Sequence, residues 1–159
     1  MKLRTFVNTL TKVKPALASK DLIPIMAHYC FQDGNVFAYN DVVAIMCPCD
    51  TDVEGAIRGD TLLTFVSTSM AKEVDIQVKN TEAVVKAGSA KLNVPMLGVD
   101  DFMWEPPSVD DFSVIVEVDE DLMRGLDLSL LSAGQSVGTP ELSGITMSIG
   151  SHCTMFSSN

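Results

Sequence analysis

The first 20 residues combine an apolar stripe with a positive charge, and the stripe requires a partner surface to cover it. The stripe consists of Leu3, Phe6, Val7, Leu10, Val13 and Leu17, which recur at the i, i+3, i+4, i+7 spacing of an amphipathic helix. The opposite face carries Arg4, Thr5, Asn8 and Lys12. Pro15 is predicted to bend or end this helix near Thr11 to Lys14, because proline disrupts the helical hydrogen bonds.

The same segment holds five cations and no acid. The cations are Lys2, Arg4, Lys12, Lys14 and Lys20. The whole chain carries −10 and this segment carries +5, so residues 21 to 159 carry −15. A solvated helix face that happens to be basic is the plain interpretation. The functional interpretation is a small basic surface for DNA on a protein whose remaining acidity discourages nonspecific binding.

Length and composition limit the class of protein. The 159 residues suffice for one domain, or for one domain and part of another. A hydrophobic content of 47% excludes a disordered chain. No run reaches the roughly 18 apolar residues of a membrane span, and the N-terminus lacks the apolar core of a signal peptide. A cytoplasmic protein is therefore expected. The cysteines are predicted to be buried or half-buried free thiols; they are Cys30, Cys47, Cys49 and Cys153.

Short strands and two further helices are predicted after the first helix. The strand patterns cover Leu22–Gln32, Val36–Tyr39, Val42–Cys47, Val53–Ile57, Val74–Val78, Ala83–Ala87, Lys91–Val94, Phe112–Val118, Leu142–Ile149 and Thr154–Ser157. One helix is expected over Thr61–Lys72. The other begins at about Glu120, is capped by Asp119 and ends at Gly134. Met96–Pro107 reads as an irregular connector.

An internal repeat with a shift of 116 residues organises these elements. The corresponding pairs are Phe6 with Leu122, Leu10 with Leu126, Pro24 with Pro140, and Gly34 with Gly150. A repeat of this length indicates two similar domains in tandem. We predict a first domain over residues 1–97 with its first strand nearly absent, a linker over 98–111, and an incomplete second domain over 112–159. An incomplete second domain is typical of a fragment.

Four stretches, in this order and spacing, resemble one known family. They are Leu22–Met26 after the first helix, Asp52–Ile57 before the second, Ala87–Val94 followed by Asp100, Asp101 and Phe102, and Pro140–Ile145. Each stretch alone is a weak signal, but together they span nearly the whole chain. They resemble the DNA polymerase sliding clamp of the bacterial β-subunit type, which includes phage-encoded members.

The resemblance implies a fold, an assembly and a set of partners. Clamp domains are α+β, with repeated β-α-β-β-β units whose helices lie on one face of antiparallel sheets. Three such domains form a bacterial protomer, and two protomers close head to tail into a ring. The ring encircles duplex DNA without sequence preference and tethers the replicative polymerase after a clamp loader has placed it. A clamp has no catalytic residues, cofactor or metal, and contacts to phosphates suit a protein that slides.

The resemblance also assigns residues to surfaces. The positions expected to face DNA are Arg4, Lys12, Lys14, Lys20, Lys72, Arg124, Gln135 and Ser136. Among them, Arg4, Lys12 and Lys72 are expected on lining helices. The positions expected to meet a neighbouring subunit are Lys86, Ser89, Lys91 and Asn93. No residue is assigned to the family's peptide-binding cleft.

Other chemistry has weaker support. Asp50 to Gly55 begins like a calcium-binding loop, but Thr61 stands where the final glutamate belongs, so a turn is the better interpretation. His28 and His152 lack partners at ligand spacing and are interpreted as structural. No phosphate-binding or nucleophile motif is present. Two alternatives stay open: a clamp-derived protein-binding module that does not close a ring, and an unrelated enzyme of mixed α and β structure.

Overall fold

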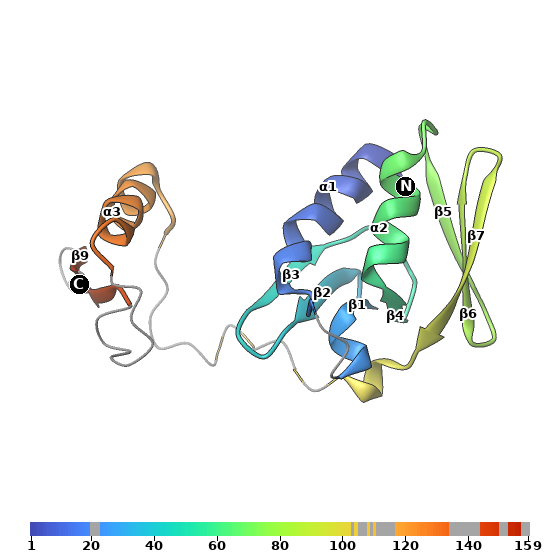
Figure 1. The fold of residues 1–159 in the computed structure, drawn as a ribbon. Coiled ribbons are helices and arrows are strands. Elements are labelled where there is room, and N and C mark those ends of the chain that lie inside the picture. The colour runs from blue at the N-terminus through green and yellow to red at the C-terminus, as the bar shows by residue number, and fades with distance from the viewer. Residues whose placement is uncertain are drawn as a thin grey trace. The chain divides into compact units, whose positions relative to one another are not determined.

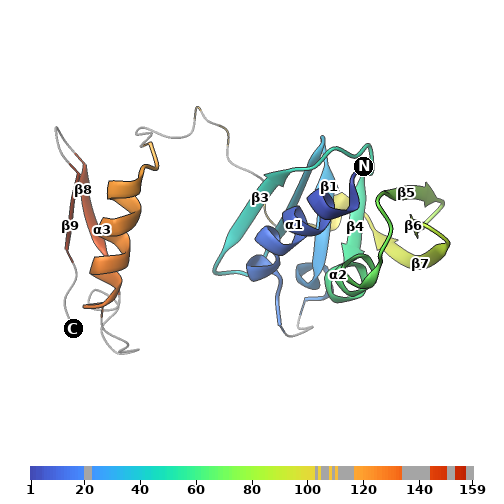
Figure 2. The same cartoon turned by 90° about the horizontal axis from the view of Figure 1, so that it is seen from above.

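A seven-stranded antiparallel sheet with two helices on one of its faces forms the first part of the chain (Figures 1 and 2). The computed structural model describes residues 1–19, 23–102, 104, 108, 110, 117–133, 144–149 and 153–156. The chain divides into two units, residues 1–107 and 108–159. The predicted α+β class is confirmed.

The first unit contains most of the secondary structure. Its strands are β1 (His28–Gln32), β2 (Asn35–Tyr39), β3 (Ala44–Pro48), β4 (Gly55–Arg58), β5 (Val74–Lys79), β6 (Glu82–Ala87) and β7 (Ala90–Leu97). Their order across the sheet is β3-β2-β1-β4-β7-β6-β5. The helices are α1 (Leu3–Val13) and α2 (Gly59–Thr68), and 3-10 turns occur at η1 (Lys14–Ala16), η2 (Pro24–Ala27) and η3 (Val99–Asp101).

The core lies between the helices and the sheet. The apolar stripe predicted for α1 is confirmed, because Leu3, Phe6, Leu10 and Val13 are all buried. The ring of Phe6 stacks on the ring of Phe31 in β1 at a centroid distance of 6.2 Å. The helix ends at Val13 and passes into η1, as expected from Pro15. Burial of these side chains, rather than helix propensity alone, therefore holds α1 in place.

A buried hydroxyl group connects α1 to the sheet. The side chain of Tyr29 in β1 is fully buried, and its hydroxyl group donates a hydrogen bond of 2.9 Å to the carbonyl oxygen of Leu10. Burial raises the pKa of Tyr29 to about 12, so the hydroxyl stays protonated at neutral pH and remains a donor. This bond lies near the C-terminal end of α1 and fixes that end against β1.

The N-terminus pairs with the chain just before β5. Lys2 forms an isolated antiparallel bridge with Glu73. The amide of Leu3 donates to the carbonyl oxygen of Lys72 at 3.0 Å, and the amide of Val74 donates to that of Met1 at 3.0 Å. The segment before α1 is therefore short, and it is paired with the chain just before β5.

The helix predicted over Thr61–Lys72 was placed wrongly at both ends. It begins at Gly59 and ends at Thr68, after which Ser69 adopts an extended conformation. The Thr68 hydroxyl group donates to the Thr64 carbonyl oxygen at 2.8 Å, competing with backbone hydrogen bonding. Since Lys72 must reach the backbone of Leu3, the chain leaves the helix before it.

Several strand boundaries also differ from prediction, and β4 begins at Gly55 rather than at Val53. Pro24–Ala27 is the 3-10 turn η2, and the strand begins only at His28, whose Nδ1 lies 2.7 Å from the Pro24 carbonyl oxygen. Strand β3 begins at Ala44, because the Val43 amide donates to the Asn40 side chain at 2.9 Å. Strand β7 continues through Met96–Leu97, which had been predicted as irregular, because this end pairs with β4.

The second unit contains one helix and one hairpin. These elements are α3 (Glu120–Leu130), β8 (Thr146–Ile149) and β9 (Cys153–Phe156). The predicted cap is confirmed, since the Asp119 carboxylate accepts a hydrogen bond of 2.7 Å from the Leu122 amide. A helix followed by an antiparallel hairpin repeats the order α1, β1, β2, as the internal repeat predicted.

Several predictions for this unit fall outside the described residues or need correction. Outside the described residues lie 112–116, Gly134, 142–143, 150–152 and 157–159. Glu117 and Val118 are not in a strand, and α3 ends at Leu130, because Leu131 and Ser132 form a turn. Strand β8 begins at Thr146 rather than Leu142.

Three of the four cysteines are free thiols as predicted, and His28 is buried with its Nδ1 near the Pro24 carbonyl oxygen. Cys30 and Cys49 are buried free thiols, and Cys47 is a half-buried one. Burial raises the pKa of Cys30 to about 12. Burial, reinforced by the Asp50 carboxylate, raises the pKa of Cys49 to about 11, so these two thiols stay protonated at neutral pH. The side chain of Cys153 and all of His152 lie outside the described residues. Within the described ranges, no helix is long and apolar enough to cross a membrane.

We predict that Tyr29→Phe lowers the free energy of unfolding by about 1 kcal/mol, because it removes one buried hydrogen bond. Tyr39→Phe is the matched control, since its hydroxyl group donates to Asp41 at an exposed site. Urea denaturation of both variants measures the difference. Equal stability of the two variants would contradict the role given to the Tyr29 bond.

Candidate nucleic-acid interface

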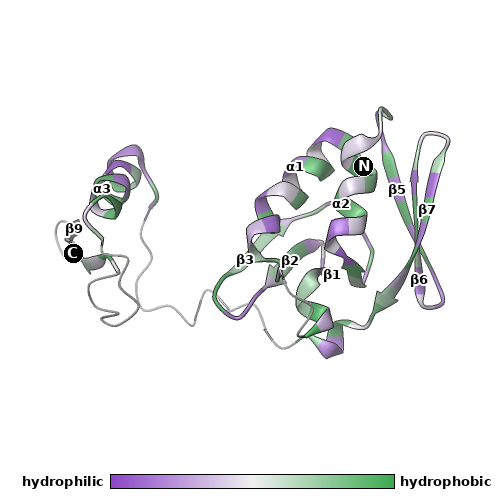
Figure 3. Cartoon of the chain, viewed as in Figure 1, coloured by the Kyte–Doolittle hydropathy of each residue, from purple (hydrophilic) through white to green (hydrophobic). Residues whose placement is uncertain are grey.

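The exposed face of α1 is basic along its whole length. Arg4, Asn8 and Lys12 follow one another at intervals of four residues and are all exposed, as predicted. No acidic residue lies on α1, whereas α2 carries Asp60 and the other described acids of this unit lie on strands, turns and loops. Figure 3 shows hydrophilic and hydrophobic stretches alternating along this helix. The cations of α1 are therefore presented to solvent by the same packing that buries its apolar stripe.

The spacing of Arg4 and Lys12 suits a ligand with regularly repeated negative charges, such as the phosphates of a nucleic-acid strand. Arg4 and Lys12 are eight residues apart, which corresponds to about 12 Å along a helix that rises 1.5 Å per residue. Long, flexible side chains at this separation can each reach a different phosphate of a nucleic-acid strand. Such contacts neutralise charge without reading base sequence.

Helix α2 packs beside α1 and adds hydroxyl groups to the same side of the sheet (Figures 1 and 2). Thr64, Ser67 and Thr68 are exposed on it. Its acid, Asp60, is paired with the Arg58 guanidinium at 3.1 Å. Burial alone would raise the pKa of Asp60. Hydrogen bonds from the Thr61 amide, Arg58 and the Thr61 hydroxyl outweigh burial, so the pKa of Asp60 lies below its usual value. The Asp60 charge is thus partly compensated locally.

A hollow of about 310 Å³ lies where α1 ends and α2 begins. Lys14 and Arg58 both line it, together with Gly59 and Leu17. A Cβ atom at Gly59 would lie 2.5 Å from Leu17 Cδ1, so glycine permits this close approach. Sequence reasoning did not assign Arg58 to the interface. The available signal was its place directly before the predicted second helix, but its nearness to Lys14 depends on tertiary packing.

The other residues predicted to face DNA are distributed differently. Lys72 is exposed, but it lies in the connection after α2 and not on a helix, beside the start of α1. Arg124 is exposed on α3, as predicted. Its helix also exposes Glu120, Asp121 and Asp127, so the surface of α3 is acidic overall, unlike that of α1. Lys20, Gln135 and Ser136 lie outside the described residues.

The residues predicted for a subunit interface share one hairpin. Lys86 in β6 and Lys91 in β7 are directly opposite each other, and Ser89 lies in the turn between the strands. Asn93 pairs with Val84, and all four predicted positions are exposed. Like charges in opposite positions destabilise a hairpin, and an acidic surface against them would relieve that repulsion. In the described parts of the chain, no group of three histidine, cysteine or acidic side chains is placed to hold a metal.

The architecture matches solved structures of one kind. A DNA polymerase III β subunit from Thermotoga maritima aligns with a TM-score of 0.77 at 19% identity, covering 100% of this chain and 46% of that chain. A sliding clamp from Bacillus subtilis aligns with a TM-score of 0.77 at 19% identity, covering 94% and 43%. One from Bartonella birtlesii aligns with a TM-score of 0.79 at 17% identity, covering 99% and 46%. The chain has the fold of a bacterial sliding clamp.

The resemblance to the clamp fold inferred from sequence is thereby confirmed at the level of structure. The chain spans less than half of the length of these solved clamps. No protein-family model matches the sequence, and no curated protein matches it either. At such low identity the clamp fold is recognisable in the arrangement of helices and sheet, and much less so in individual residues.

We predict that Arg4→Glu combined with Lys12→Glu weakens binding to a duplex and lowers its salt dependence. Each lost phosphate contact reduces the slope of log K against log salt by about 0.9, so the pair reduces it by about 1.8. Fluorescence anisotropy with a labelled duplex at several salt concentrations measures both effects.

The matched control is Lys79→Glu on the sheet strand β5, compared with Arg4→Glu alone, because the two single variants change the net charge equally. The control is expected to show the same slope of log K against log salt as the unsubstituted chain. Equal losses in Arg4→Glu and Lys79→Glu would show that binding follows net charge and not the face of α1.

Proposed function

We propose that the protein is a DNA sliding clamp, which encircles duplex DNA and tethers the replicative polymerase. The observation that carries the proposal is the exposed basic face of α1, free of acids, within a clamp fold. In a chain with a net charge of −10, such a face is the surface that a phosphate backbone would meet most favourably.

The proposed DNA surface is formed by helices and is independent of sequence. Arg4 and Lys12 on α1 contact phosphates, and Lys14 with Arg58 extends the surface toward the start of α2. Lys72 lies beside the start of α1, and Lys20, Arg124, Gln135 and Ser136 are proposed to provide further contacts to phosphates. Exposed hydroxyl groups on α2 offer neutral hydrogen bonds to phosphate oxygens. Weak, exchangeable contacts of this kind permit movement along the duplex.

The proposed assembly requires more surface than this chain alone provides. Lys86, Ser89, Lys91 and Asn93 meet a neighbouring subunit of a ring-shaped homo-oligomer. The facing lysines at positions 86 and 91 support this role, because a partner carboxylate would relieve their repulsion.

We place the protein in the cytoplasm, where a clamp loader and the polymerase act on it. No described feature favours the alternative of a protein-binding module that does not close a ring.

The protein is proposed to act without catalysis. The polymerase performs the chemistry, and the clamp contributes by keeping it near the template. Tethering raises the local concentration of the polymerase at its substrate, and no new chemical contact is needed for this effect.

We expect the protein to stay on circular DNA and to leave linear DNA. Loaded onto a nicked plasmid by its clamp loader with ATP, it should remain bound through gel filtration in high salt, because a closed ring cannot dissociate laterally. Cutting the plasmid once should release it, since the ring can slide off an end. Retention on linear DNA equal to that on the circle, or no retention on the circle, would contradict the proposal.

A further inference from the structure

A second hollow lies on the face of the sheet that points away from α1 and α2. We call it the aromatic hollow; it has a volume of about 580 Å³ and lies between strands β1–β3 and the segment after β7. Its apolar lining includes Phe37, Met46, Phe102 and Trp104. Phe37 pairs with Met46 across β2 and β3, so both side chains share this face, whereas the neighbouring Val36 points into the helix-side core. The volume is within the range of roughly 300–1,000 Å³ typical of ligand sites.

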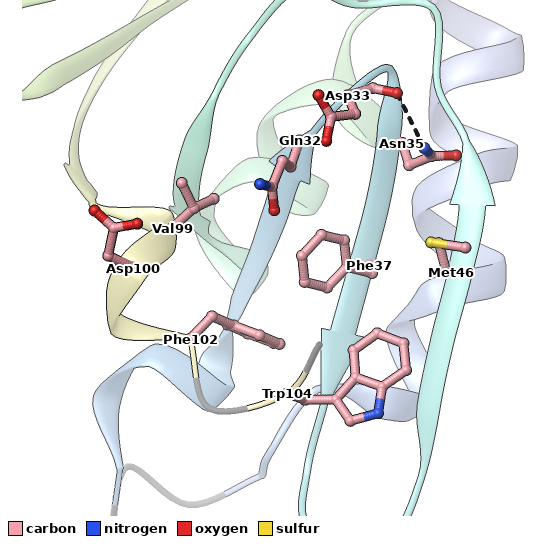
Figure 4. Close-up of a pocket in the computed structure, with 9 residues that line it drawn as sticks. All are labelled: Gln32, Asp33, Asn35, Phe37, Met46, Val99, Asp100, Phe102 and Trp104. Atoms are coloured by element: carbon pink, nitrogen blue, oxygen red, sulfur yellow. Dashed lines mark hydrogen bonds between the residues drawn. The ribbon is translucent and has the colours of Figure 1, made fainter. Parts of the chain in front are cut away.

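The aromatic side chains of the hollow support one another. The rings of Phe37 and Phe102 meet edge to face at 5.0 Å, and the rings of Phe37 and Trp104 are 5.7 Å apart. Trp104 also stacks on Tyr39 at 6.3 Å. Figure 4 shows the three rings of Phe37, Phe102 and Trp104 gathered together, with polar side chains at the other end of the hollow. These contacts position a preformed wall of π surfaces, which attracts a cation lying over a ring face.

The charges of the hollow are all negative. Asp33 and Asp100 line it, and no lysine, arginine or histidine is among the described residues of its lining. Both carboxylates are on exposed residues, and within the described part of the chain neither pairs with a cation. Gln32 and Asn35 add amide groups beside Asp33 (Figure 4). A ligand that complements this lining carries positive charge and a flat or apolar surface, and a nucleic-acid phosphate would be repelled.

We propose that the aromatic hollow binds an arginine side chain of an extended segment of a partner protein. A guanidinium group is planar and stacks on aromatic rings, and its edge donates paired hydrogen bonds to a carboxylate. The half-buried rings of Phe102 and Trp104, held in place by the buried ring of Phe37, provide the stacking surface, and Asp100 or Asp33 accepts the hydrogen bonds. Lysine fits less well, because its ammonium group is a strongly hydrated point charge. This inference does not depend on DNA binding, since it concerns the opposite face of the sheet.

The single tryptophan of the chain allows a direct test. The full chain is titrated with the acetylated and amidated peptide Gly-Ala-Arg-Ala-Gly, and the fluorescence of Trp104 is followed. A saturable change is expected with this peptide. The same peptide with citrulline, the neutral counterpart of arginine, should bind about fivefold more weakly, because it keeps the planar group but loses the charge.

Variants locate the binding site and keep the test decisive. Asp33→Asn combined with Asp100→Asn should lower the affinity for the arginine peptide about fivefold or more. Asp75→Asn on β5 should leave that affinity unchanged. Met46→Lys places a cation in the hollow at a side chain that is 46% exposed, so it should abolish binding without disturbing the fold. Three results would overturn the proposal. They are equal binding of the two peptides, no saturable change in fluorescence, and unchanged binding in Met46→Lys or in the double variant Asp33→Asn with Asp100→Asn.

Discussion

The fold of the first unit depends on the burial of one helix stripe against the sheet. Leu3, Phe6, Leu10 and Val13 of α1 contact the inward side chains of the strands, and the Tyr29 hydroxyl group fixes the end of the helix. A helix buried along one stripe must present its opposite face to solvent. The basic surface is therefore a geometric consequence of the core, and a change that rotates α1 would displace its cations as well.

Features that follow from local periodicity could be predicted from the sequence. Arg4 and Lys12 were placed correctly because spacing along one helix determines its exposed face. The Asp119 cap was also predicted, since it involves residues only three apart. The class of fold and the repeat of helix and hairpin follow from the order of such local patterns.

Features that depend on distant residues could not be predicted. Lys72 was assigned to a helix because its own segment has helical spacing, but pairing with the N-terminus draws it out of that helix. The connector containing Phe102 and Trp104 was predicted to be irregular, yet both rings pack against Phe37, which is more than 60 positions earlier in the chain. The nearness of Lys14 and Arg58 likewise exists only in the folded structure.

Strand β7 joins the two half-sheets of the first unit, β1–β4 and β5–β7, and it pairs unequally with its two neighbours. Six residue pairs connect β7 to β6, whereas two pairs, at Met96 and Leu97, connect it to β4. The seam between the half-sheets is thus held by few backbone hydrogen bonds, and local opening at such places requires less free energy than global unfolding. The β5–β6–β7 half-sheet can consequently behave as a separate cooperative unit, whose amide protons exchange with solvent while the β1–β4 half-sheet stays closed.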